Sequence, residues 1–141
     1  MDQRISFITL AVRDLEASRR FYLDGLGWEA ELFVPGDVLM IRTGQHLILS
    51  LWAEPGFEAE VGPIRRGEGI VPVTISHNVR TEAEVDAVLE TARAAGADPV
   101  ASAQQREWGG YTGYFADPDG YRWEVATNPG PTGELVLPDT V

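Results

Sequence analysis

The chain has 141 residues, of which 44% are apolar and 23% charged, as is typical of a soluble globular domain or of two small fused modules. The absence of cysteine excludes disulfides, thiolate zinc sites and iron–sulfur clusters, and the absence of lysine excludes Schiff-base catalysis by a lysine amine. The net charge of −11 argues against nucleic-acid binding, and no apolar run is long enough to cross a membrane, so we expect a cytoplasmic protein.

The first part of the chain has the pattern of a βαβββ module. Residues 5–12 are β-branched and apolar, which favours a strand, and Asp14 is placed as the N-cap of a helix that ends around Gly25 and Gly27. Turn residues at 35–37 and 43–45 then separate three short segments of strand character. These predicted strands are 28–34, 38–42 and 46–52.

The same pattern starts again at residue 71. Residues 71–79 predict a strand, Thr81 and Glu84 form a capping box, and Gly96 is a natural end for the helix. Three more strands are expected after it, with a strong turn over 117–120 between the last two. These predicted strands are 98–102, 111–116 and 121–127.

The two patterns form an internal repeat, because Val12-Arg13-Asp14 is matched by Val79-Arg80-Thr81 at the same step of the module. We therefore predict an α+β fold of two tandem βαβββ modules, 1–53 and 71–128. Residues 54–70, rich in Gly, Pro and Glu, are predicted to be a linker. Residues 129–141 are predicted to be a C-terminal arm that packs on this subunit or on a partner, with a frayed terminus as the alternative.

Side chains alternate between the two faces of a strand, and this places one carboxylate, Glu124, on the face away from the helices. Arg122 lies two residues earlier on the same face and is the candidate partner of Glu124, in which case the two could form a purely structural ion pair. The other residues expected on this face are Phe7, Ser50, Trp52, Thr74 and Asn78.

The duplicated module, the run 8–15 with Phe21-Tyr22 and Leu26-Gly27 behind it, and the late run 115–124 resemble the vicinal oxygen chelate superfamily. That group includes glyoxalase I, extradiol dioxygenases, fosfomycin-resistance transferases and bleomycin-resistance proteins. The resemblance covers residues 5–128. It implies the glyoxalase/bleomycin resistance/dioxygenase fold, a curved mixed sheet around a concave pocket, and a homodimer.

Enzymes of that superfamily hold a divalent metal with one ligand from each of four strands. The resemblance places these four ligands at Phe7, Ser50, Thr74 and Glu124. Only Glu124 is a usual ligand, and a divalent ion needs roughly four or more oxygen or nitrogen donors, so we expect no metal there and no other cofactor. A relocated site using His46 or His77 with Glu124 stays open, although strand alternation places His77 on the helix side.

Two classes of function remain open. In the first, the protein is metal-free and binds a small aromatic or cationic compound, with Glu124 neutralising its charge. In the second, it is a lyase, isomerase or dioxygenase-type enzyme for a small carbonyl or phenolic substrate, with Glu124 as catalytic base or metal ligand. Trp108 either covers the ligand or packs structurally. The expected ligand-binding residues are Phe7, Phe33, Ser50, Trp52, Thr74, Asn78, Trp108, Tyr114 and Arg122.

Overall fold

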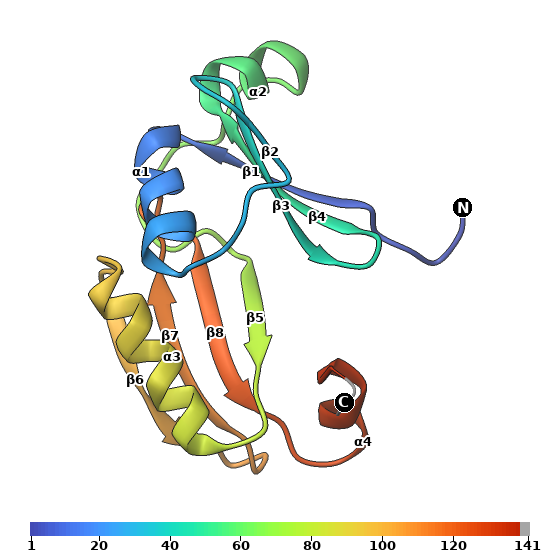
Figure 1. Ribbon diagram of the computed structural model, residues 1–141, viewed down its shortest axis with the longest axis vertical. Coiled ribbons are helices and arrows are strands. Elements are labelled where there is room, and N and C mark those ends of the chain that lie inside the picture. The colour runs from blue at the N-terminus through green and yellow to red at the C-terminus, as the bar shows by residue number, and fades with distance from the viewer. Residues whose placement is uncertain (139–141) are drawn as a thin grey trace. The chain divides into compact units, whose positions relative to one another are not determined.

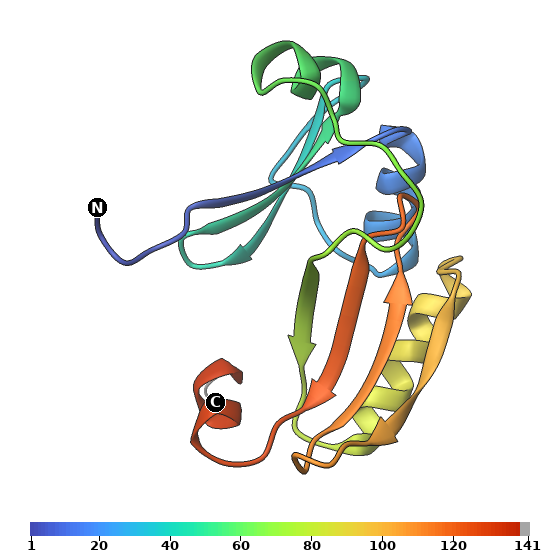
Figure 2. The same ribbon diagram turned by 180° about the vertical axis from the view of Figure 1, so that it is seen from behind.

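The computed structural model describes residues 1–138 and divides the chain into two compact units (Figures 1 and 2). Unit 1 is Met1–Gly69, and unit 2 begins at Ile70. Each unit holds one four-stranded sheet with helices, as predicted for an α+β fold. Over residues 1–138 no helix combines the length and the apolar character that a membrane span requires.

Unit 1 forms a sheet in the order β1-β4-β3-β2, in which β1 runs parallel to β4 and the other pairs are antiparallel. Its elements are β1 (Phe7–Val12), α1 (Leu15–Arg19), η1 (Arg20–Gly25), β2 (Leu32–Val34), β3 (Val38–Gly44), β4 (Leu47–Ala53) and α2 (Glu54–Glu60). The Asp14 side chain accepts from the Ala17 amide at 3.0 Å, which confirms the predicted N-cap.

Unit 2 repeats this arrangement with the strand order β5-β8-β7-β6, again with the first pair parallel. Its elements are β5 (Thr74–Asn78), α3 (Glu82–Ala94), β6 (Val100–Gln105), β7 (Tyr111–Ala116), β8 (Arg122–Thr127) and α4 (Pro131–Val136). The identical strand order in both units confirms the internal repeat.

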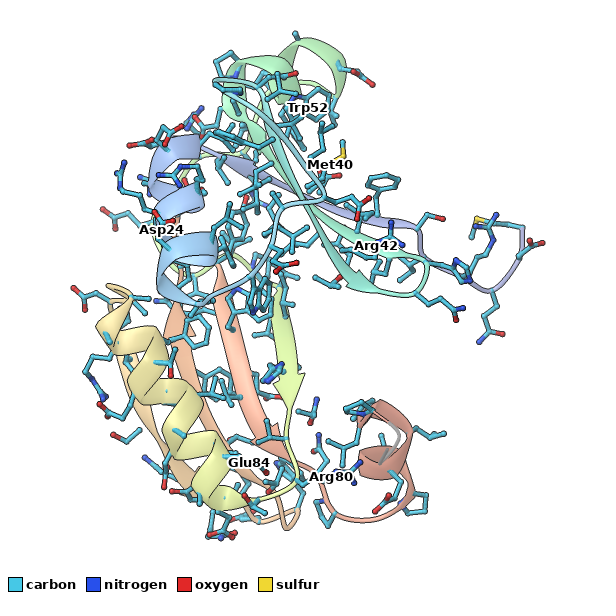
Figure 3. All side chains as sticks on the ribbon, in the orientation of Figure 1. Asp24, Met40, Arg42, Trp52, Arg80 and Glu84 are labelled. Carbon is cyan, nitrogen blue, oxygen red and sulfur yellow. The ribbon has the colours of Figure 1, made fainter. Side chains whose placement is uncertain are left out.

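Helix α3 begins with the predicted capping box. The Glu84 amide donates to the Thr81 hydroxyl at 3.2 Å, and the Glu84 carboxylate accepts from the Thr81 amide at 2.8 Å. The Thr81 hydroxyl also donates to the Glu84 carboxylate at 2.9 Å, and this bond, followed by the one from the Thr81 amide, lowers the pKa of the Glu84 carboxyl. Figure 3 marks Glu84 at the start of α3. The helix then buries one stripe of side chains, Val85, Leu89 and Ala92, against its sheet.

Two helices lie where the sequence suggested none. The expected linker 54–70 starts with α2, and the expected arm contains α4. Both carry proline in the first turn, where its missing N–H costs nothing. The arm is attached to the rest of unit 2, because the Arg80 guanidinium donates to the Pro138 carbonyl at 2.5 Å.

The predicted strands differ from the observed ones mainly at their starts. The segment 28–34 pairs only over Leu32–Val34, and the segment 98–102 becomes a strand from Val100 to Gln105. Pro99 has no N–H to donate to a ladder, which is consistent with the later start of β6. Residues 139–141 of the expected arm lie outside the described residues.

Candidate functional site

Helix α3 covers one face of the unit 2 sheet, and the opposite face carries Glu124. Directly paired residues of a ladder point to the same side, so the register defines the members of this face. We call it the Glu124 face. Its members are Thr74, Ser76, Asn78, Ala101, Gln104, Thr112, Tyr114, Ala116, Arg122, Glu124 and Ala126.

The Glu124 carboxylate is held by two hydroxyl groups from the neighbouring strands. Ser76 Oγ donates to Oε1 at 3.1 Å, and Tyr114 Oη donates to Oε2 at 2.7 Å. Ser76, Glu124 and Tyr114 are paired in the register, so they form a straight row across β5, β8 and β7. Each carboxylate oxygen has a second lone pair, so the row can still accept a donor from a ligand.

Arg122 does not fill the role expected for it as the partner of Glu124. Its Nη1 donates to the Gly120 carbonyl at 3.1 Å, toward the turn that precedes β8. That turn has the predicted form, with Gly120 at φ 86° and its amide bonded to the Asp117 carbonyl at 3.0 Å. The carboxylate is therefore stabilised by neutral donors, and Arg122 keeps a separate place on the same face.

Tyr114 lies between Glu124 and a guanidinium that sequence reasoning missed. The hydrogen bond to Glu124 raises the pKa of the Tyr114 phenol above its usual range, and partial burial adds to this. On the other side, Arg106 Cζ lies 6.0 Å from the centroid of the Tyr114 ring. Arg106 is fixed there by Thr112, whose hydroxyl accepts from Nε at 2.6 Å and whose carbonyl accepts from Nη2 at 3.2 Å.

Trp108 sits in the loop between β6 and β7. The loop is closed by two backbone bonds, from the Arg106 amide to the Gly110 carbonyl at 2.8 Å and from the Gly109 amide to the Arg106 carbonyl at 2.9 Å. The Trp108 ring covers Gly110, where an added Cβ would come within 1.8 Å of it. The side chain is nevertheless 54% exposed. The indole thus packs on the loop while keeping a large accessible surface.

The unit 1 sheet has the corresponding face opposite its buried core, and we call it the Ser50 face. The register assigns to it Phe7, Thr9, Ala11, Leu32, Val34, Val38, Met40, Arg42, Ile48, Ser50 and Trp52. Phe7 is 53% exposed, whereas Ser50 is only 4% exposed. The face is apolar apart from Arg42 and two hydroxyls, and Arg42 pairs with Glu31 at 2.9 Å.

Trp52 is engaged by its own unit. Its Nε1 donates to Asp37 Oδ1 at 3.2 Å, and its ring meets Phe57 of α2 edge-on at 6.0 Å (Figure 3). Gly56 of α2 allows this contact, because a Cβ there would lie 2.6 Å from Nε1. Helix α2 therefore covers part of the indole that was expected to contact a ligand.

Phe33 lies on the other side of the unit 1 sheet from the rest of the expected site. It pairs with Leu39, which is fully buried and in turn pairs with Leu51 on the core face. A three-residue strand shows too little alternation in sequence to reveal this. Of the other expected residues, Phe7, Ser50 and Trp52 belong to the Ser50 face, and Thr74, Asn78, Tyr114, Arg122 and Glu124 belong to the Glu124 face.

The comparisons with known proteins agree with this architecture. Residues 4–125 match the model of the Glyoxalase/Bleomycin resistance protein/Dioxygenase superfamily. The chain belongs to this superfamily. A solved glyoxalase-related enzyme from Fulvimarina pelagi is 36% identical to it with a TM-score of 0.80, over 90% of this chain and 89% of that one. The comparison with curated proteins finds no match.

Two further solved structures show how broad the superfamily is. A lactoylglutathione lyase from Agrobacterium tumefaciens is 27% identical with a TM-score of 0.67, over 89% of this chain and 93% of that one. The fosfomycin resistance protein FosX from Mesorhizobium loti is 19% identical with a TM-score of 0.66, over 96% of this chain and 99% of that one, and shows the shared fold alone. The predicted resemblance is therefore confirmed at the level of the superfamily.

The residues at the metal positions of this superfamily do not fit a divalent ion. Phe7 offers no donor atom, Ser50 and Thr74 offer only neutral hydroxyls, and Glu124 is a single carboxylate. His77 pairs with Val125 on the helix side of the sheet, away from Glu124. Within residues 1–138 no group of three or more His, Asp and Glu side chains is placed to hold a metal.

Proposed function

We propose that this protein binds a small aromatic or cationic compound on the Glu124 face, without a divalent metal. The observation that carries the proposal is the row Ser76–Glu124–Tyr114, in which two neutral hydroxyls hold one carboxylate. Neutral donors orient a carboxylate without cancelling its charge. The carboxylate therefore retains its attraction for an ammonium or an N–H group of a ligand.

The surroundings of Glu124 support an aromatic ligand. Tyr114 provides a ring beside the carboxylate, to which its hydroxyl is bonded at 2.7 Å. Thr74 and Ser76 are exposed at the edge strand β5, so the row is accessible from solvent within unit 2. A flat ligand with one donor group matches this combination of ring, hydroxyl and carboxylate.

Calorimetric titration of chelator-treated protein with benzylammonium and larger cationic aromatic amines tests the proposal. We expect stoichiometric binding that is about 10- to 100-fold weaker in Glu124→Gln, the usual range for a charge-assisted hydrogen bond. Glu134→Gln, on the exposed first turn of α4, is the matched control because it removes the same charge from another element. Equal binding by the two variants, or no binding by the natural protein, would overturn the proposal.

A second candidate is catalysis of proton transfer on a small carbonyl or phenolic compound. Two observations favour it: Glu124 lies 2.7 Å from a phenol oxygen, and the 36% identical structure is named a glyoxalase-related enzyme. In this reaction Glu124 takes a proton from the carbon next to the carbonyl and returns it. Incubation with an α-hydroxy ketone in deuterated water should then exchange that proton in the natural protein but not in Glu124→Gln. Equal exchange in both would remove Glu124 from the mechanism.

A further inference from the structure

The Glu124 face has a charge balance opposite to that of the chain. The whole sequence has 22 acidic and 11 basic residues, whereas this face carries one carboxylate and one guanidinium, and a second guanidinium lies over it. Arg122 is a member of the face, and Arg106 reaches it through Thr112 and Tyr114. The remaining members are uncharged.

Arg122 is the more significant of the two cations, because it shares a strand and a face with Glu124. Its Nη1 donates to the Gly120 carbonyl, whereas a guanidinium has five N–H donors. Within residues 1–138 no carboxylate forms an ion pair with Arg122. Its side chain is half-buried, so this cation is partly withdrawn from water without a carboxylate partner among these residues.

Several arginines of the chain, by contrast, have acidic partners. In unit 1, Arg19 pairs with Glu16, Arg42 with Glu31 and Arg66 with Glu54, each at 2.9 Å. Acidic side chains outnumber basic ones two to one over the whole sequence. Arg106 is similar to Arg122, because the bonds that hold it over the Glu124 face go to the hydroxyl and the carbonyl of Thr112 and not to a carboxylate.

We propose that the ligand is amphoteric: it presents an acidic group to Arg122 and an ammonium or N–H group to Glu124. This inference rests on the proposed function and specifies its ligand class. Residues two apart on one face of a strand are separated by about 6–7 Å, so the two ligand groups should lie roughly one aromatic ring apart. Arg122 then acts as a specificity-determining residue through the paired N–H groups that favour a carboxylate.

Three probes built on one benzene ring distinguish failure of this inference from failure of the proposed function: benzylammonium, benzoate and 4-(aminomethyl)benzoate. We expect the natural protein to bind 4-(aminomethyl)benzoate about tenfold or more tightly than benzylammonium, since a charge-assisted bond contributes this much. Arg122→Gln should abolish that preference, so that 4-(aminomethyl)benzoate no longer binds more tightly than benzylammonium. Arg65→Gln, an exposed arginine of unit 1, removes the same charge and should preserve the preference.

The outcomes are distinguishable. Glu124-dependent binding of benzylammonium with no gain for 4-(aminomethyl)benzoate, or a gain that survives Arg122→Gln, would overturn the inference while the proposed function stands. No binding of any probe by the natural protein would overturn both. If Arg122→Gln does not fold, as judged by circular dichroism, Arg122→Lys is used instead. It keeps the charge but not the paired N–H geometry, and should lose part of the preference.

Discussion

The two units place different chemistry on one scaffold. In unit 1, Thr9, Ser50 and Met40 are paired across β1, β4 and β3, and in unit 2 the corresponding row is Ser76, Glu124 and Tyr114. The strand order and the parallel first pair are the same in both. The repeat thus fixes where the side chains lie. Glu124 in place of Ser50 and Tyr114 in place of Met40 convert an uncharged row into a charged one.

The two replacements in unit 2, Glu124 and Tyr114, depend on each other. A carboxylate removed from water needs donors, and the phenol of Tyr114 supplies the shorter of the two bonds to Glu124. In unit 1 the equivalent Met40 offers no donor, and Ser50 is 4% exposed. The comparison teaches that the candidate site is a property of the whole row and not of Glu124 alone.

The largest expected loss of stability comes from placing a carboxylate in the unit 1 row at the position that corresponds to Glu124. Ser50→Glu buries a carboxylate in a row where Met40 replaces the phenol of Tyr114, and should lower the free energy of unfolding by about 3 kcal/mol in urea denaturation. Ser50→Gln is the matched control for size, and the difference between the two variants measures the charge. Adding Met40→Tyr to Ser50→Glu should recover about 1 kcal/mol. Equal losses of unfolding free energy in Ser50→Glu and Ser50→Gln would show that the size of the new side chain, and not its charge, causes the loss.

The next effect concerns the helix side of the sheets. The residue of unit 2 that corresponds to the buried Leu39 is Gly113, where a Cβ would lie 2.4 Å from Leu89 of α3 and 2.9 Å from the Ala101 carbonyl. Gly113→Ala should therefore cost about 1–3 kcal/mol by overpacking. Gly67→Ala has nothing within 4 Å of its Cβ and should change stability little. An unchanged free energy of unfolding in Gly113→Ala would mean that α3 can move to accommodate the added Cβ at no cost in stability.

The helix caps give a smaller difference. Thr81→Ala removes the reciprocal cap of α3 and should cost about 1 kcal/mol, whereas Thr81→Ser should be nearly neutral. The effect should depend on pH, because the cap lowers the pKa of Glu84. This contribution to stability is present above the usual glutamate range and is lost as pH falls through the lowered pKa. Denaturation of both variants across the acidic range checks this, and a pH-independent difference would contradict it.

The smallest effect is a titration shift at the row itself. Glu124→Gln should lower the pKa of Tyr114, because the hydrogen bond to the carboxylate is the main cause of its elevation. The chain has four tyrosines, so the phenolate absorbance that is lost in Tyr114→Phe identifies the Tyr114 titration, and a Tyr111→Phe background removes the tyrosine whose pKa Asp86 also raises. A raised tyrosine pKa contributes stability that is lost as pH rises through it, so Glu124→Gln should also weaken the alkaline destabilisation. An unchanged titration would show that the bond is absent in solution.

Local patterns in the sequence were sufficient for much of this protein. The repeat, the caps at Asp14 and Thr81, and the turn before β8 depend on residues close together in the chain. The face of Glu124 followed from alternation alone, because a strand of six residues has one possible division between its two sides. These features are set by backbone geometry and by side chains within a few residues of one another.

Tertiary structure decided which groups form hydrogen bonds and contacts with the site residues. Alternation placed Arg122 beside Glu124, but the hydroxyls of Ser76 and Tyr114 reach the carboxylate from strands 48 and 10 residues away in the chain. Arg106 comes to the face only because its loop folds back onto Thr112, and α2 forms against Trp52. Which donor meets which acceptor depends on strand register and loop packing. Both are set by contacts between distant segments, so no local pattern carries them.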